Sequence, residues 1–157
     1  MKHLSSFLFP GSRVAIVGSR DFPAPDMVEA FVADLPEVVV VSGSDWERWR
    51  RGGAVGSCGG IVDLTAVDSA RKFGLEVCEF PPDWVRYRRG AGIVRNGVLV
   101  ASGLSVLVAF ASDPRHLSPG TADVIRKAVA ARVPVFVFGP DGADCRKISK
   151  PVQMAMF

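Results

Sequence analysis

The 157-residue sequence has few of the side chains that bind metal ions or form disulfide frameworks. It contains three cysteines and two histidines, and no two cysteines stand in a C-x-x-C pair. This supply gives no zinc-type ligand cluster, and an odd number of cysteines without a secretory leader is typical of a reducing compartment. We therefore expect a cytoplasmic protein with no metal centre and no cofactor.

Long hydrophobic runs are also missing. The longest strongly apolar stretch, residues 98–111, is interrupted by Ser102, Gly103 and Ser105. It is shorter than the roughly 20 residues that span a bilayer, so we expect a core segment and no membrane partner. The net charge of +3 favours anionic partners. It is too small for a dedicated duplex-DNA binder.

What is present is the composition of an ordinary globular domain. Apolar residues make up 48% of the chain and charged residues 22%, and a chain of this length buries a full hydrophobic core without disulfides. We predict one domain over residues 1–157, with its core at about 13–138, a short N-terminal extension over 1–10 and a polar C-terminal tail.

Short apolar runs alternate with helical periodicity, which is typical of an α/β fold with a parallel sheet. Strands are predicted over residues 13–17, 37–41, 75–80, 104–110 and 133–138, and helices over 26–34, 61–73, 91–101 and 120–132. This is a three-layer, Rossmann-like, doubly wound sheet of about five strands, with the expected order 3-2-1-4-5. Ligands then bind where the strand order reverses, between the loops that follow strands one and four.

The loop after the first strand is equipped to bind phosphate. Gly18 and Ser19 bring backbone N–H groups close to an anion, Arg20 adds a charged clamp, and Phe22 follows. The structural alternative is a tight turn with a solvated arginine. A complete G-x-G-x-x-G fingerprint is absent, which disfavours a standard nicotinamide dinucleotide fold.

A second anion seat is predicted at the start of the last helix. Ser118, Pro119, Gly120 and Thr121 precede or open that helix, where free N–H donors and hydroxyl groups are available. Alternatively, Ser118 only caps the helix and Pro119 occupies its first turn. Two such loops facing one cleft favour a nucleotide-binding site.

Other polar residues complete the expected site. Ser42 and Gly43 follow the second strand, and Gly60 precedes a helix that carries Asp63 in its first turn. Asp63 either accepts hydrogen bonds from a ribose or is only a first-turn carboxylate that the helix dipole favours. Arg95 and Asn96 lie within a helix, near neither end, so their polar groups need solvent, a partner or a ligand.

Two clusters combine aromatic side chains with arginines. One contains Trp46 and Trp49, and the other contains Trp84 and Tyr87. Such mixtures stack bases and bind phosphates of single-stranded nucleic acids. The alternative, favoured for Trp84, is that the aromatics anchor loops to the core or to a second subunit.

The ordered motifs resemble the YspA-like branch of the SLOG superfamily, which is Rossmann-like and binds nucleotides. The resemblance covers about residues 13–138. It rests on the segments VAIVGSRDF (14–22), SG (42–43), GIVD (60–63), FPPDW (80–84), RN (95–96) and PGT (119–121). By this resemblance, we expect a homodimer or a larger homo-oligomer.

The phosphoribohydrolases of that superfamily cleave the N-glycosidic bond of nucleoside monophosphates with an arginine and a glutamate. By resemblance, Arg95 stands at the arginine position, but Val124 replaces the glutamate. Asp123 is the nearest carboxylate, turned about 100° around the helix. Arg95 and Asp123 are therefore the candidate catalytic pair. A Trp/Arg-rich insertion over residues 45–57 is a second departure from the family pattern, expected to remodel the rim of the pocket.

The resulting expectation is a protein that binds a nucleotide or nucleotide-derived metabolite, as a sensor or a sequestering protein. The first alternative is hydrolysis of a nucleoside 5′-monophosphate. The second is single-stranded DNA binding, as in the Smf proteins of the same superfamily.

Overall fold

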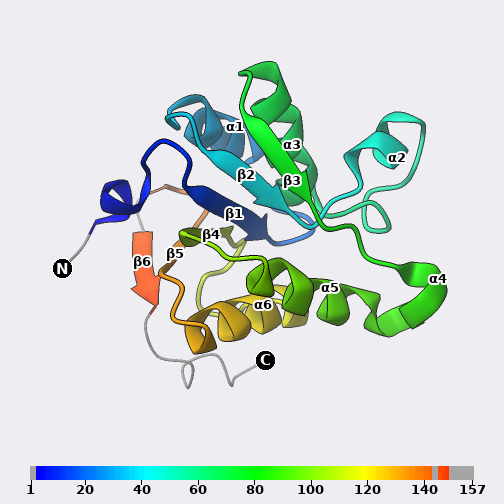
Figure 1. The fold of residues 1–157 in the computed structure, drawn as a ribbon. Helices are drawn as coiled ribbons and strands as arrows, with labels where there is room; N and C mark the ends of the chain where they lie inside the picture. The colour runs from blue at the N-terminus through cyan, green and yellow to red at the C-terminus, as the bar shows by residue number, and fades with distance from the viewer. Residues whose placement is uncertain (1–2, 143–144, 149–157) are drawn as a thin grey trace.

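The computed structural model describes residues 3–142 and 145–148 and shows an α/β fold with a six-stranded, mostly parallel sheet (Figure 1). The sheet order is β3-β2-β1-β4-β5-β6. The parallel strands are β1 (Arg13–Gly18), β2 (Val39–Ser42), β3 (Glu76–Glu79), β4 (Val106–Phe110) and β5 (Val135–Phe138). The predicted fold class and the predicted order of these five strands are confirmed. The order reverses between β1 and β4.

The sixth strand, β6 (Cys145–Ile148), pairs antiparallel with β5, and Ile148 stands opposite Val135. The prediction of a polar tail is wrong for this segment. Its sequence, CRKI, has two adjacent charges and no apolar alternation. An edge strand needs few apolar side chains because main-chain hydrogen bonds to its one neighbour hold it, so its sequence carried no strand signal.

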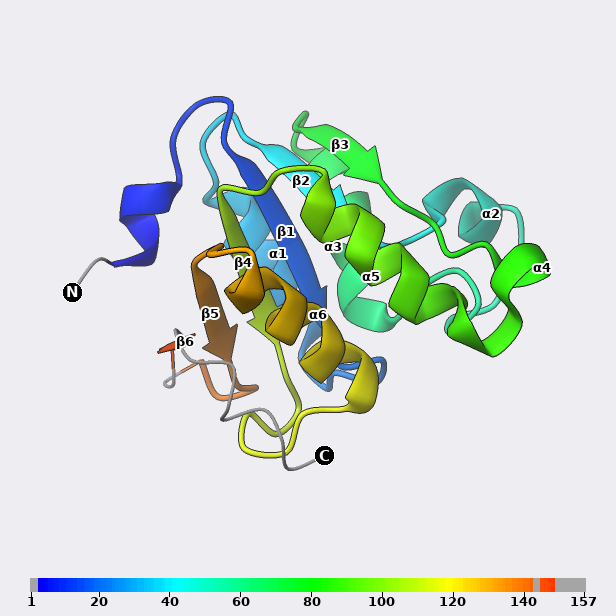
Figure 2. The same ribbon diagram turned by 60° about the horizontal axis from the view of Figure 1, so that its bottom comes forward.

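Helices cover both faces of the sheet, as the three-layer prediction requires. The helices α1 (Pro25–Ala33) and α3 (Ile61–Lys72) pack on one face, and α5 (Ala91–Ala101) and α6 (Pro119–Ala130) pack on the other (Figures 1 and 2).

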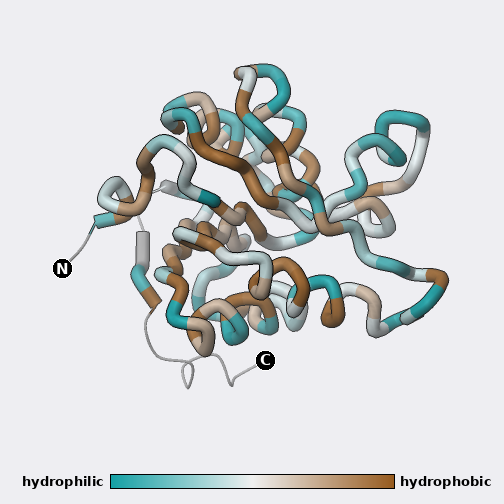
Figure 3. Tube along the Cα trace, viewed as in Figure 1, coloured by the Kyte–Doolittle hydropathy of each residue, from teal (hydrophilic) through white to brown (hydrophobic). Residues whose placement is uncertain are grey.

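Alternate residues of β1 serve the two layers. Val14 and Ile16 belong to the core beneath α1 and α3, whereas Ala15 and Val17 belong to the core beneath α5 and α6. Side chains of a strand point to opposite faces in turn, so a strand buried on both faces is apolar throughout. Figure 3 shows this hydrophobic character along the central strands.

Two shorter elements extend beyond the carboxyl ends of the strands. The helix α2 (Trp46–Arg50) forms within the insertion, and α4 (Trp84–Tyr87) is followed by a 3-10 turn, η2 (Arg88–Gly90). Both helices lie on the same side of the molecule (Figures 1 and 2). The indole N–H of Trp84 donates to the carbonyl oxygen of Ser57 at 2.7 Å. This bond joins the insertion to α4.

The N-terminal segment packs against the sheet. A 3-10 turn, η1 (Leu4–Phe7), places the ring of Phe7 with its centroid 5.9 Å from that of Phe136 in β5. Leu4 and Leu8 pack against the same core. The packed core therefore begins well before residue 13, where the sequence placed its start.

The start of α1 also differs from the prediction. The helix was predicted to begin at Asp26, but Ala24 is the N-cap, Pro25 occupies the first turn and Asp26 follows it. Proline suits this position because it has no N–H to leave unpaired, and an aspartate in the first turn interacts favourably with the helix dipole. No helix within residues 3–142 and 145–148 has the length and apolar character required to cross a bilayer.

Candidate functional site

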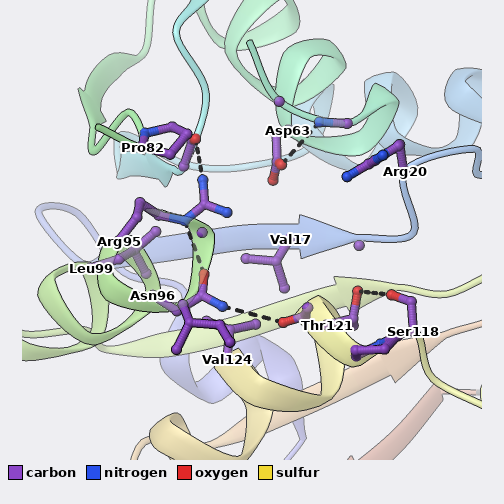
Figure 4. Close-up of a pocket in the computed structure, with 18 of the residues that line it drawn as sticks. Val17, Arg20, Asp63, Pro82, Arg95, Asn96, Leu99, Ser118, Thr121 and Val124 are labelled. Carbon is purple, nitrogen blue, oxygen red and sulfur yellow. Dashed lines mark hydrogen bonds between the residues drawn. The ribbon is translucent and has the colours of Figure 1, made fainter. Parts of the chain in front are cut away.

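A cleft of about 480 Å³ lies where the strand order reverses, between α3 on one side and α5 and α6 on the other (Figure 4). Most of the residues singled out in the sequence line it. These are Gly18, Arg20, Gly43, Gly60, Asp63, Arg95, Asn96, Ser118, Pro119, Gly120 and Thr121. Four others, Ser19, Phe22, Ser42 and Asp123, are not part of the lining.

The end of β1 is held tightly against β4, which explains its glycine. A Cβ atom on Gly18 would overlap the carbonyl oxygen of Phe110 and lie 2.8 Å from a methyl group of Val62. Ser19 donates its N–H to the Phe110 carbonyl at 3.0 Å, and its hydroxyl accepts from the N–H of Ser112 at 2.9 Å. Gly18 and Ser19 thus brace the two loops, and the Ser19 amide is not free to bind phosphate.

Phe22 also has a structural role. It is buried, and its ring packs edge-on against Phe110, with the centroids 5.8 Å apart. Its position in the core fixes the loop that carries Arg20.

Arg20 is the part of this loop that faces the cleft. Its backbone carbonyl accepts from the N–H of Ile61 at 3.0 Å, which ties the loop to the start of α3. The side chain is exposed and extends into the cleft (Figure 4). Its guanidinium has no ion pair or hydrogen bond with any residue that the structure describes. It is therefore available to an anion.

The second anion seat is the N-terminus of α6. Ser118 is the N-cap residue and Pro119 opens the helix, as the structural alternative proposed. The Ser118 hydroxyl, however, donates to the hydroxyl of Thr121 at 3.0 Å and caps no backbone N–H. The first-turn amides of a helix have no intrahelical acceptor. The N–H groups of Gly120 and Thr121 therefore remain for a ligand at the cleft wall.

Arg95 is positioned from two sides. Its Nε donates to Oδ1 of Asn96 at 2.9 Å, and its guanidinium donates to the carbonyl oxygen of Gly43. A side chain at Gly43 would occupy the place of this guanidinium, so glycine leaves room for the present position of Arg95. The arginine spans the gap between α5 and the loop after β2 (Figure 4).

Asp63 supplies the carboxyl group of the cleft lining. Its Oδ2 accepts the N–H of Gly60 at 3.3 Å, while Oδ1 has no hydrogen-bond partner among the residues described. Burial raises the pKa of Asp63, and the charge of Arg95 and the Gly60 N–H oppose this rise. Figure 4 shows the carboxyl group directed into the cavity. Ser42, which is fully buried, donates to the backbone carbonyl of Asp63 at 3.3 Å and so positions this residue from outside the lining.

Asp123 lies outside the cleft lining. Its Oδ2 accepts from Nδ2 of Asn96 at 3.0 Å and from Nζ of Lys127 at 2.8 Å, and Arg126 approaches Oδ1 at 3.6 Å. These contacts, all with side chains of α5 and α6, occupy the carboxylate of Asp123. Val124, one residue later, is the residue that lines the cleft. This placement does not favour the catalytic role expected for Asp123.

Several lining residues were not among the predicted ligand contacts. Pro82, Trp84, Arg89, Gly92 and Ile93 come from the segment before and within α5, Gly56 comes from the insertion, and Gly59 follows it. The FPPDW segment was part of the resemblance and could have indicated this wall. Its contact with the insertion depends on the tertiary fold.

The structure favours anchoring over stacking for Trp46 in the Trp/Arg cluster of the insertion. Only 7% of Trp46 is accessible. Its indole N–H donates to Asp68 at 3.2 Å, and the guanidinium groups of Arg50 and Arg71 lie 5.0 and 4.3 Å from the centroid of its ring. Trp46 therefore anchors the insertion to α3, as the second of the two alternatives has it.

No protein-family model, curated protein or solved structure matches this chain. The resemblance to the SLOG superfamily stays a prediction, and the function proposed below is based on the geometry of the cleft.

Proposed function

We propose that this chain binds a nucleotide or a nucleotide-derived metabolite in the cleft between α3, α5 and α6, as a sensor or a sequestering protein. One observation carries the proposal: three arginines, Arg20, Arg89 and Arg95, line the cleft, and among the described residues only Asp63 adds a carboxyl group to this lining. Guanidinium groups bind phosphate with paired, charge-assisted hydrogen bonds. A ligand that carries a phosphate group fits this surplus of positive charge.

The phosphate belongs at the end of the cleft formed by Arg20 and the N-terminus of α6. There, an unpaired guanidinium and the free amides of Gly120 and Thr121 converge, and the helix dipole favours negative charge. Asp63 and Arg95 follow along the cleft. The unpaired Oδ1 of Asp63 is suited to accept a hydrogen bond from a ribose hydroxyl.

Neither alternative function gains a specific contact from the structure. The hydrolase alternative assigned to Asp123 the carboxylate that stabilises an oxocarbenium-like transition state with Arg95, and Asp123 is not part of the cleft lining. The DNA alternative used the insertion as a stacking platform, but Trp46 is buried. We therefore propose ligand binding without assigning a turnover step.

Thermal unfolding with a ligand panel tests the proposal. The panel contains nucleoside mono- and diphosphates, cyclic nucleotides, dinucleotides and a short single-stranded oligonucleotide. A ligand at one hundred times its dissociation constant adds about 2.7 kcal/mol of stability. We expect a shift with a nucleotide that is lost in Arg20→Ala and kept in Arg51→Ala, an exposed arginine outside the cleft lining.

Other outcomes would contradict the proposal. Stabilisation by the oligonucleotide alone, with affinity that falls steeply with salt at a log-log slope of about −0.7 per phosphate contact, would indicate strand binding. An equal loss of the shift in Arg20→Ala and Arg51→Ala would show a general charge effect and no site at Arg20.

A further inference from the structure

The end of the cleft opposite the anion seats has a different chemistry. In Figure 4, Pro82 and Leu99 lie at one end of the cavity, while Arg20 and Ser118 lie at the other. The lining residues Trp84 and Ile93 come from the same stretch of chain as Pro82. We call the first end apolar and the second end charged, although the guanidinium of Arg95 lies beside Pro82. A ligand that fills the cleft must combine an anionic group with an apolar one.

Trp84 is the aromatic side chain of this apolar end, and its orientation is fixed. Its indole N–H donates to the carbonyl of Ser57 at 2.7 Å, so the edge of the ring that carries the nitrogen faces the insertion. Asp83 caps the short helix by accepting the N–H of Arg86 at 3.0 Å. The first bond holds the nitrogen edge of the indole against the insertion, and the second stabilises the start of the helix that carries the ring.

The indole is only half buried although its polar atom is satisfied. A fixed, partly open aromatic surface at the end of a nucleotide-sized cleft is suited to stack on a planar ring, since stacking is favourable for every base.

We propose that Pro82, Trp84 and Ile93 form a nucleobase subsite and that Trp84 is its stacking platform. The inference rests on the proposed nucleotide function and deepens it, because it makes the base a source of affinity. A nucleotide must then bind more tightly than the same sugar phosphate without a base. The insertion acts through Ser57 as a positioning segment for the ring.

Isothermal titration calorimetry tests this inference with AMP, GMP, CMP and UMP as nucleotide probes and ribose 5-phosphate as the probe without a base. Base stacking on an aromatic side chain contributes enough binding energy to expect at least a tenfold preference for the best nucleotide over ribose 5-phosphate. We expect Trp84→Leu to remove most of this preference by weakening the nucleotide alone.

Two further variants separate stacking from loop anchoring. Trp84→Phe keeps an aromatic face and removes the N–H donor to Ser57, so it should keep more of the preference than Trp84→Leu. Trp49→Leu removes a half-buried indole of the same insertion that is not part of the cleft lining. It should leave the preference unchanged.

The possible failures are distinguishable. If neither the nucleotides nor ribose 5-phosphate bind, the proposed function is overturned and the subsite with it. If ribose 5-phosphate binds as tightly as every nucleotide, the phosphate seat stands and the base subsite is overturned. Equal weakening of the best nucleotide and ribose 5-phosphate in Trp84→Leu, or equal losses of preference in Trp84→Phe and Trp84→Leu, would reduce Trp84 to an anchor of the loop.

Discussion

The two ends of the cleft are built from different parts of the fold. The charged end is made by the loop after β1 and by the start of α6, and both stand beside the two central strands of the sheet. The apolar end is made by the stretch from Pro82 to α5, whose Trp84 is joined to the insertion by its bond to Ser57.

This difference shows which features the topology determines. A doubly wound sheet places the carboxyl ends of its central strands and the adjoining helix N-termini around one crevice, whatever the ligand. A base subsite instead depends on segments whose position the sheet topology does not determine. The charged end should therefore tolerate few backbone changes, while the apolar end should control ligand choice.

The largest effect is expected at the floor of the charged end, from Gly18→Ala. The new Cβ would overlap the carbonyl oxygen of Phe110 in the paired strand, and backbone cannot move aside as a side chain can. We expect the free energy of unfolding to fall by about 3 kcal/mol, measured by urea denaturation.

The control for this variant is Gly97→Ala in α5. Nothing lies within 4 Å of a Cβ built at Gly97. Alanine should raise the free energy of unfolding there by up to about 1 kcal/mol, because glycine is the weaker helix former. Equal stability of Gly18→Ala and the unchanged protein would contradict the close contact between β1 and β4.

A smaller effect, on binding instead of folding, is expected from Gly43→Ala. Its Cβ would occupy the position of the Arg95 guanidinium, which lies beside Pro82 in the cleft. The arginine side chain can swing away, so stability should change little. We expect calorimetry to show about tenfold weaker binding of both the best nucleotide and ribose 5-phosphate, since a hydrogen bond to a charged group contributes about 1.5–3 kcal/mol.

The matched control is Gly92→Ala, whose Cβ would meet the same guanidinium at 3.9 Å, an ordinary contact. It should leave both affinities nearly unchanged. If Gly43→Ala weakens binding of the nucleotide but not of ribose 5-phosphate, Arg95 acts on the base and not on the sugar phosphate, which would contradict this prediction.

The sequence predicted the architecture because the buried strands carry unambiguous patterns. Residues 104–110 contain no charge, which indicated a central strand, and β4 lies at the centre of the sheet. The sequence failed at β6, where Arg146 and Lys147 gave no apolar pattern and the pairing depends on the exposed edge of β5.

The candidate site was predictable where it follows from strand ends and was missed where it depends on contacts distant in sequence. Arg20 and Asp63 stand directly after a strand and at a helix start, so topology places them at the cleft. The burial of Trp46 depends on Asp68 and Arg71, more than twenty residues away. No local pattern in the insertion could show that pairing.

The smallest effect concerns Asp63, which lies between the two ends (Figure 4). Burial raises its pKa above 3.8, with Arg95 and the Gly60 N–H opposing the rise. Between 3.8 and the raised pKa, the folded protein binds more protons at this site than the unfolded chain. The contribution of Asp63 to stability is therefore most favourable below 3.8 and declines as the pH rises through the raised pKa.

Asp63→Asn removes this titration and keeps an oxygen that can accept the Gly60 N–H. Its free energy of unfolding, relative to that of the unchanged protein, should therefore rise between pH 3.8 and pH 7, as measured by urea denaturation at several pH values. Asp34→Asn, at the exposed C-cap of α1, is the matched control. A difference for Asp63→Asn that falls with pH would mean that the Arg95 charge outweighs burial. The carboxylate would then act mainly as a charged partner of Arg95.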